Sequence, residues 1–300
     1  MSPTVKNWIL AIRPWSFPAS TMPALLVISY VFLNQNSFPD GINWWYGMLA
    51  LLGAVIFHAS GNLISDYFDF KYKVDRKDSF GSSRMLVDGV FTPKSILSLG
   101  IVFMLIGILI GFFLLFNTGM DLLWIGVIGV LGTFFYYKLK FVALGDLLIL
   151  IIYGPLIGFG TAFVMTNRLL WEVILLTIPV ALLVVNILHS NNTRDIRDDG
   201  KANIKTLAMK LGIKGSKVQY ILNAMLAYVV VSLMVVFGML HPLSLVVFIT
   251  LPMALKNIKI MQLAEIEKPE LIKDLDASSA QLVMAFSVLF SLSNVIAYYL

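Results

Sequence analysis

The sequence predicts an all-α polytopic membrane protein with nine transmembrane helices and a cytoplasmic N-terminus. Of its 300 residues, 59% are hydrophobic and 13% are charged, whereas a soluble domain carries about 25% charged residues. Several apolar runs reach the roughly 20 residues that a helix needs to cross a bilayer. The basic residues, moreover, are confined to alternate loops. These three observations together exclude a soluble globular protein.

Several apolar runs contain Pro or Gly, including Pro18, Pro23, Gly154 and Pro155. Membrane helices tolerate these residues, so the runs are still predicted to be helical. The predicted spans are 17–34, 43–64, 95–116, 119–137, 141–166, 169–190, 219–239, 242–258 and 279–300. The segment before them has no small-residue cleavage site, so we expect a short interfacial helix there. No linker or change of composition divides the chain, and residues 1–300 are predicted to form a single domain.

The distribution of charge fixes the orientation of the spans. With the N-terminus inside, all of the 22 Lys and Arg residues except Arg168 fall on inner segments, as the positive-inside rule requires. The net charge of +5 therefore reflects membrane topology, and no nucleic-acid partner is expected. The chain has no cysteine, which excludes disulfides and thiolate metal sites. We expect an integral protein of the bacterial cytoplasmic membrane.

Two inner segments, 61–89 and 189–208, differ from the others because they carry acids as well as bases. Their Asn and Asp residues occupy the same relative positions 0, 4 and 7, which share one face of a helix. The first set is Asn62, Asp66 and Asp69, and the second is Asn191, Asp195 and Asp198, with Asp199 at position 8. The pattern predicts that each block continues its span as a helix and directs several oxygens one way.

Oxygen-rich clusters with amide side chains are suited to Mg²⁺, which takes few protein carboxylates and completes its shell with water and phosphate oxygens. Basic side chains are predicted on the same side of the membrane: Arg84, Lys138, Lys140, Arg194 and Lys201. Acids, divalent cations and bases together are typical of a diphosphate site. Lys140 lies in a very short loop and is therefore the base that we expect to be held at the cavity mouth.

A diphosphate site in a membrane favours a polyprenyl diphosphate, whose tail needs an apolar environment. Ionisation of such an allylic donor releases pyrophosphate and leaves a carbocation. Cations and basic groups stabilise the leaving charge, aromatic faces stabilise the carbocation, and water must be excluded. Tyr136 and Tyr153 lie near the inner helix ends and are candidates for the aromatic faces, and Lys140 is the candidate for stabilising the charge of the leaving group.

The residues resemble a known family. "GNLISDYFDFKYKVD" and "NNTRDIRDDGKANIKTLA" are similar to the two acidic motifs of the UbiA superfamily of intramembrane aromatic prenyltransferases. "KFVALGDLLILIIYGPL", "HSNNTRD" and "SSRMLVDG" resemble the branch that prenylates 1,4-dihydroxy-2-naphthoate in menaquinone synthesis, which also includes the animal vitamin K2-forming enzyme. The resemblance implies nine helices around a central lipid-accessible cavity.

The resemblance also implies roles for individual residues. It places Mg²⁺ on Asn62, Asp66, Asp69 and Asp75 of the first motif and on Asn191, Asp195 and Asp199 of the second. It places the diphosphate on Arg84, Lys140 and Arg194. Lys73 stands where the family usually has Gly, which leaves the position of Asp75 open, and spacing favours Asp198 and Asp199 equally. Asp146 is a candidate for orienting the aromatic acceptor or activating its hydroxyl.

Two alternatives remain open from the sequence. A membrane transporter also fits nine helices and a pseudo-repeat, although transporters usually place ionisable groups at the bilayer midplane. Within the prenyl-transfer chemistry, 4-hydroxybenzoate or homogentisate is an alternative acceptor, because the metal site does not distinguish acceptors. Isoprenoid length and oligomeric state are not encoded in any motif.

Overall fold

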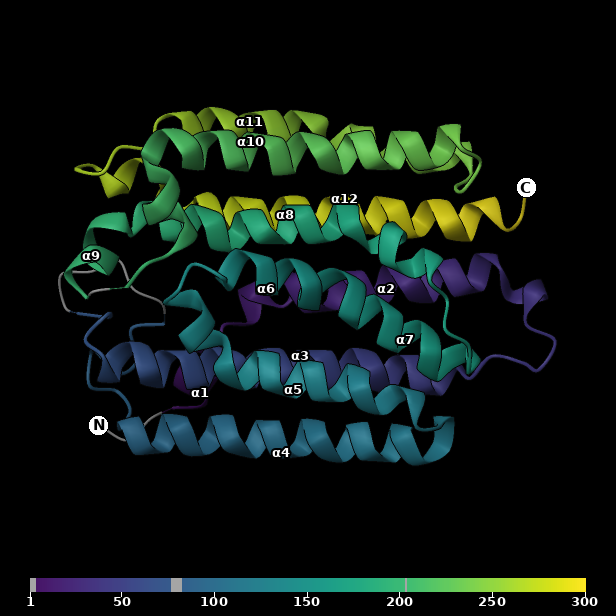
Figure 1. Ribbon diagram of the computed structural model, residues 1–300, viewed down its shortest axis with the longest axis horizontal. Coiled ribbons are helices and arrows are strands. Elements are labelled where there is room, and N and C mark those ends of the chain that lie inside the picture. Colours follow the sequence, from purple (N-terminus) through teal and green to yellow (C-terminus); the bar gives the residue numbers. More distant parts are fainter. Residues whose placement is uncertain (1–3, 77–82, 203) are drawn as a thin grey trace.

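The computed structural model describes residues 4–76, 83–202 and 204–300, and every regular element in them is helical. The long helices run nearly parallel to one axis of the molecule (Figure 1). They are α2 (Pro18–Leu33), α3 (Trp44–Lys71), α4 (Pro93–Thr118), α5 (Asp121–Lys140), α8 (Glu172–Arg194), α10 (Leu207–Val236) and α12 (Leu275–Ala297). Short helices complete the fold: α1 (Val5–Ala11), α6 (Gly145–Ile151), α7 (Ile157–Thr166), α9 (Ile196–Lys201) and α11 (Leu251–Gln262).

The helices are long and apolar enough to account for the predicted spans. Eight described segments meet the length and hydropathy of a membrane span, and the bent pair Val5–Ser16 and Pro18–Leu33 brings the number to nine. The pair bends by 55° between Ser16 and Pro18, and within its first member Arg13 adopts a left-handed φ of 56° ahead of Pro14. The predicted interfacial segment is thus α1 followed by a 3₁₀ turn, and the all-helical membrane fold is confirmed.

Three spans differ from regular helices. The predicted span 242–258 begins as a 3₁₀ helix, Pro242–Thr250, and continues as α11. Helix α10 begins 12 residues before the predicted start at residue 219, and it is broken at Gly212, where φ is 65°. Between α6 and α7 lies a π-helical turn, Ile152–Leu156, that contains Pro155. Because proline cannot donate a backbone hydrogen bond, the ladder is interrupted here. Single π-turns of this kind are frequent at functional sites.

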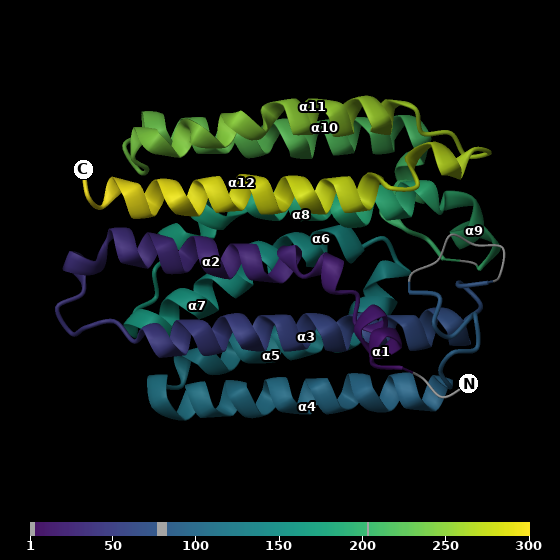
Figure 2. The same cartoon turned by 180° about the vertical axis from the view of Figure 1, so that it is seen from behind.

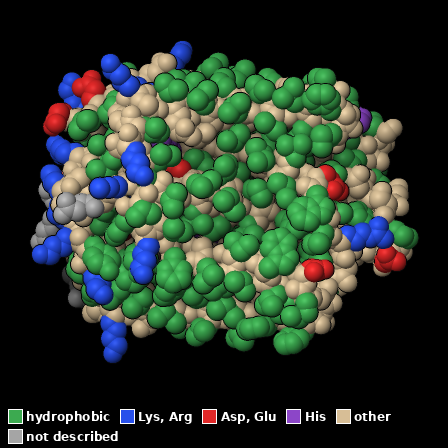
Figure 3. Space-filling model, in the orientation of Figure 1, with side chains coloured by type: hydrophobic (Ala, Val, Ile, Leu, Met, Phe, Trp, Pro, Cys, Tyr) green, Lys and Arg blue, Asp and Glu red, His purple; other side chains and the backbone are tan. Residues whose placement is uncertain are grey.

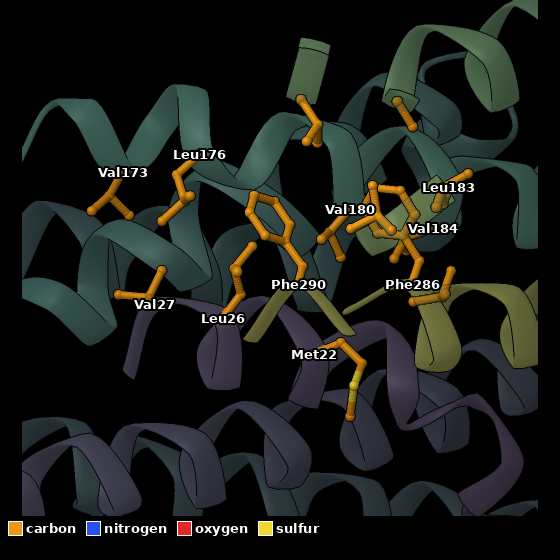
Figure 4. Close-up of a cluster of buried hydrophobic side chains, with 14 of the residues drawn as sticks. Met22, Leu26, Val27, Val173, Leu176, Val180, Leu183, Val184, Phe286 and Phe290 are labelled. Carbon is orange, nitrogen blue, oxygen red and sulfur yellow. The ribbon is translucent and has the colours of Figure 1, made fainter. Parts of the chain in front are cut away.

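The main core lies between α2, α8 and α12, in the middle of the bundle in both ribbon views (Figures 1 and 2). Leu26, Val180 and Phe290 are among its fully buried side chains, and Figure 4 shows the two phenylalanines of α12 inserted between α2 and α8. In a bilayer the hydrophobic effect does not favour contact between helices over contact with lipid, because lipid tails are equally apolar. Close packing and hydrogen bonds between helices therefore hold such bundles together. An example is Asn186 of α8, which donates to the Tyr220 carbonyl of α10 over 2.9 Å.

The outer surface agrees with a membrane environment. In Figure 3 hydrophobic side chains cover the middle of the molecule, and Lys and Arg gather mainly at the end that carries α9 and the N-terminus. Leu109, Phe116 and Ile249 are among the large hydrophobic side chains that are exposed. The two polar blocks found in the sequence lie at the basic end, where they enclose a cavity.

Candidate active site

A polar cavity of about 260 Å³ opens between the basic ends of α3, α5, α8 and α9 and the start of α12. Most of the predicted site residues line it: Asn62, Asp69, Asp75, Tyr136, Lys140, Tyr153, Asn191, Arg194, Asp195, Asp198 and Asp199. The two blocks come from segments that are far apart in sequence, and α3 and α8 bring them together at one site. Residues 77–82 of the first block lie outside the described residues.

The first block is helical, as the spacing predicts, but its three residues do not share one role. α3 continues unbroken to Lys71, so that Asn62, Asp66 and Asp69 are all helical. Asn62 and Asp69 line the cavity. Asp66, a predicted metal ligand, does not line it: it forms an ion pair with the guanidinium of Arg13 and accepts a 2.6 Å hydrogen bond from Ser83. Asp75 follows the helix, after a left-handed turn at Lys73.

The second block does not form the single helical face that the spacing predicted. α8 ends at Arg194, Asp195 is its C-cap, and a new helix, α9, begins at Ile196. The backbone leaves helical geometry at Asp195, where φ is −94° and ψ is 7°, and the Asp195 carbonyl then accepts from the amides of Asp198 and Asp199 in the first turn of α9. The acids of the second block therefore reach the cavity from two helices that point in different directions.

Every acid that faces the cavity has a basic neighbour or an open oxygen. Arg194 holds both oxygens of Asp195 at 2.8 Å. The Lys140 ammonium lies 3.4 Å from Asp69 Oδ2, which joins the α5 end to the first block. Asp198 accepts from both Arg76 and Lys201 at 3.1 Å. An anionic diphosphate would compete with these carboxylates for the same Arg and Lys side chains, so its binding would break some of the ion pairs.

The donor set also fits divalent cations. Asp69 Oδ1, Asn191 Oδ1 and Asp199 Oδ2 are buried, and none has a hydrogen-bond partner among the described residues. Carboxylate and amide oxygens left open in this way are the ligands that Mg²⁺ prefers. Within the described part of the chain no three His or acidic side chains converge on one point, so substrate oxygens would have to supply the rest of each shell.

The carboxyl of Asp199 is the most perturbed acid of the site. Burial raises its pKa to about 7, and Asp195, Asp69 and Asp75 act in the same direction while Lys140 opposes them. Proximity of like charges is the expected consequence of two acidic clusters that face one cavity. A bound cation would relieve this repulsion.

Asp146 does not line the cavity. It is buried, and its two oxygens are used within the protein: Oδ2 lies 2.7 Å from His189 Nδ1, and Oδ1 accepts from Asn192 over 3.3 Å. The other nitrogen of His189 faces the Ser216 carbonyl at 3.2 Å. The network joins α6, α8 and α10, so both carboxylate oxygens of Asp146, the predicted acceptor-orienting residue, contact protein groups and not the cavity.

This geometry predicts the result of Asp146→Asn. Replacing the carboxylate leaves the buried His189 without its charged partner, a loss of about 1–3 kcal/mol. We expect a lower Tm of the detergent-solubilised protein, with the KM for the aromatic acceptor unchanged. Thermal unfolding and acceptor titrations measure the two quantities. A normal Tm together with a raised KM for the acceptor would instead indicate that Asp146 contacts the acceptor.

Three predicted substrate-binding bases do not line the cavity. Arg84 forms an ion pair with Asp88 at 3.1 Å on the surface. Lys138 is exposed, 5.3 Å from the ring centre of Phe135, and Lys201 reaches the site only through Asp198. Helical rotation explains the exposure of Lys138, because it lies two positions before Lys140 and two steps of about 100° direct its side chain to the opposite side of the helix.

Among the titratable side chains of the cavity wall, three were not predicted from the sequence: Arg13, His58 and Asp276. Arg13 belongs to the stretch "AIRPWSFPAS", in which its neighbour Pro14 is a signal of a sharp turn. His58 lies one helical turn before Asn62. Asp276, at the start of α12, lies 4.0 Å from Arg194 Nη1, and no pattern in the sequence marks it.

A second, apolar cavity of about 230 Å³ lies next to the polar one, between α3, α4, α5 and α7. Its wall is formed by small and aliphatic side chains such as Gly53, Gly111, Gly126 and Leu156. The two cavities are adjacent, because His58, Thr133, Ile152 and Tyr153 line both. A site for charged groups and a site for a hydrocarbon chain therefore lie on the two sides of these four residues.

Comparison with known proteins gives the family. The model of the UbiA prenyltransferase family matches residues 20–272. The chain belongs to the UbiA prenyltransferase family. Its curated relatives include a UbiA prenyltransferase domain-containing protein 1 homolog of Drosophila melanogaster, 36% identical over 258 residues, with 83% of this chain and 70% of that protein covered. UbiA prenyltransferase domain-containing protein 1 of Homo sapiens is 33% identical over 234 residues, covering 76% and 68%.

Solved UbiA structures share the fold. The apo UbiA homolog from Aeropyrum pernix K1 superposes with a TM-score of 0.65 at 17% identity, covering 89% of this chain and 96% of that one. A UbiA homolog from Archaeoglobus fulgidus, bound to DMAPP and Mg²⁺, gives 0.57 at 13% identity, covering 95% and 99%. This UbiA protein is thus an integral membrane enzyme that transfers prenyl groups, and the transporter alternative is wrong. The two curated relatives are animal proteins, so they give the expected bacterial membrane no support.

Proposed function

We propose that this UbiA protein transfers a polyprenyl group from a polyprenyl diphosphate to 1,4-dihydroxy-2-naphthoate in a Mg²⁺-dependent reaction. The observation that carries the proposal is that a cavity lined by acids and bases lies next to an apolar cavity, with four residues that line both. The chemistry of the acceptor rests on the resemblance of "HSNNTRD" and "KFVALGDLLILIIYGPL" to the naphthoate branch. Other hydroxylated aromatic acids, such as 4-hydroxybenzoate and homogentisate, are the alternative acceptors.

In this proposal the diphosphate lies against Lys140 and Arg194, and the tail extends into the apolar cavity. Asp69, Asn191 and Asp199 would hold Mg²⁺, and Asn62, Asp75, Asp195 and Asp198 line the same cavity. Bound Mg²⁺ offsets the negative charge of the diphosphate as it becomes a leaving group. Lys140 adds a fixed positive charge at the same place, and Tyr136 and Tyr153 turn aromatic faces toward the allylic carbon. The active site then opens on the cytoplasmic side, because the positive-inside rule places the basic end there.

The test is a transfer assay on membranes that contain the protein, with geranylgeranyl and longer diphosphates and a panel of aromatic acids. We expect transfer to 1,4-dihydroxy-2-naphthoate that disappears in EDTA and returns with Mg²⁺, because the acids otherwise face a trianionic substrate. Full turnover in chelator would contradict the metal assignment. Transfer only to another aromatic acid would identify that acid as the acceptor.

The requirement for Mg²⁺ should depend on pH. A carboxyl whose pKa is raised to about 7 is largely protonated at pH 6 and ionised at pH 8, and only the ionised form binds a cation. We expect the Mg²⁺ concentration for half-maximal activity to fall as pH rises from 6 to 8, by up to about tenfold per unit below the pKa. In Asp199→Asn this slope should be much smaller. An equal slope in the variant would assign the titration to another acid.

A further inference from the structure

The start of α12 contributes to the polar cavity an acid that belongs to neither acidic block. Asp276 lies in the first turn of this helix and lines the cavity together with Ala277 and Ala280. The match to the UbiA family model ends at residue 272, so this part of the cavity wall lies outside the segment that the model describes. The contacts of Asp276 within the wall indicate its role.

Asp276 approaches the guanidinium of Arg194. Its Oδ2 lies 4.0 Å from Arg194 Nη1, and the same nitrogen donates a hydrogen bond to the Lys273 carbonyl over 3.2 Å. The Nε and Nη2 groups of Arg194 donate to the two oxygens of Asp195. Arg194 is thus held by two segments that are far apart in the sequence: its neighbour in the second block and the start of α12.

The contact between Asp276 and Arg194 is electrostatic, because 4.0 Å is too long for a hydrogen bond. The side chain of Arg194 is 10% exposed and that of Asp276 is 26% exposed. Fully exposed ion pairs contribute little, because water and salt screen them, whereas partly buried charges interact more strongly. The charge of Asp276 also acts on Arg13, another arginine of the cavity wall. Asp276 is therefore a counter-ion for the arginines of this cavity.

The contacts from α12 become more important when the site binds its ligands. A diphosphate competes with Asp195 for Arg194, and a divalent cation competes with Arg194 for the oxygens of Asp195. Both ligands therefore weaken the pair of Arg194 with Asp195. The Lys273 carbonyl and Asp276 lie outside the second block, so they continue to hold the guanidinium at the cavity after that pair is weakened.

We propose that Asp276 is a positioning residue for Arg194: its carboxylate holds the guanidinium at the polar cavity, where Arg194 binds the diphosphate of the donor. The proposal rests on the proposed function, which supplies the ligand of Arg194, and it adds a contribution of α12 to the diphosphate site. It has a distinctive consequence. Removing the negative charge of Asp276 weakens the binding of a negatively charged ligand, which is the opposite of the direct electrostatic effect.

The test measures the dissociation constant of inorganic pyrophosphate by isothermal titration calorimetry, on the detergent-solubilised protein in the presence of Mg²⁺. We expect Asp276→Asn to raise this constant about tenfold. Asp276→Glu keeps the charge and should restore part of the affinity. Arg194→Gln should itself weaken binding, and adding Asp276→Asn to it should change the constant by less than about twofold, because Asp276 acts through Arg194.

Two other roles of Asp276 give different results, and either result would overturn the proposal. An acid in the first turn can serve only to stabilise the N-terminus of its helix, in which case Asp276→Asn lowers Tm and leaves the dissociation constant unchanged. If Asp276 acts on the ligand only through its own charge, its removal strengthens binding, also in the Arg194→Gln protein. The binding stoichiometry reports the folded fraction, so partial loss of folded protein does not alter the constant.

Asp274→Asn is the matched control, because it makes the same change of charge two residues away. Asp274 precedes the first turn of α12, is exposed and lines neither cavity, so the constant should equal that of the native protein. Equal effects of the two variants would assign the loss to net charge and overturn the proposal. Failure of the native protein to prenylate an aromatic acid would contradict the proposed function without affecting this binding test, whereas a native protein that binds no pyrophosphate would overturn both.

Discussion

Lys140→Ala is expected to lower kcat by about 100-fold, the size typical of a lost preorganised charge at a developing anion. The Lys140 side chain is 14% exposed, its ammonium is 3.4 Å from Asp69, and it lines the cavity at the end of α5. Its charge matters most when the C1–O bond breaks, and interactions specific to the transition state appear in kcat when they are removed. Steady-state kinetics with saturating donor and acceptor measure the effect.

Two variants make this result specific. Lys140→Arg should recover only part of the rate, because a planar guanidinium does not replace a compact ammonium. Lys214→Ala removes the same charge from an exposed position in α10, outside the cavity, and should have little effect. Equal small effects of Lys140→Ala and Lys214→Ala would show that Lys140 serves only the membrane topology.

Asp69→Asn and Asp195→Asn should each reduce turnover by more than about 10³-fold, because each removes a charge from a different half of the site. Asp69 is buried and keeps one oxygen without a hydrogen-bond partner among the described residues, and Asp195 is clamped by Arg194. Neither cluster can replace the other, since they face the cavity from α3 and from the α8 end. Transfer assays at increasing Mg²⁺ measure the loss and any rescue by metal.

Asp88→Asn is the control for both variants, because Asp88 lies in the same polar block but on the surface, where it pairs with Arg84. Its turnover should stay near that of the native protein. If Asp195→Asn keeps more than about a tenth of the native rate, a loss below roughly 1.4 kcal/mol, Asp195 is not a primary ligand. Asp66→Ala is informative in a different way: Asp66 is turned toward Arg13, so its loss should lower Tm as well as activity.

Several features could be predicted from the sequence because they depend on local patterns. Apolar run length and the one-sided distribution of Lys and Arg determine a helical membrane protein, since a bilayer accepts few other solutions. The helical continuation of the first block to Lys71 follows from its 0, 4 and 7 spacing. The identity of most cavity residues follows too, because acids at one depth on two spans must meet if the spans pack together.

Only the tertiary structure determines the hydrogen-bond and ion-pair partners of the polar residues. The break at Asp195, the turn of Asp66 toward Arg13 and the engagement of Asp146 by His189 all depend on neighbours far away in the sequence or on competing backbone bonds. His58 shows the same principle. In the sequence it is one histidine in an apolar run, and its contacts with Ser16, Ser20 and Tyr153 come from three other segments. Sequence patterns determine which face of a helix is polar, whereas the packing of helices determines which polar groups are satisfied by protein and which remain open to substrate.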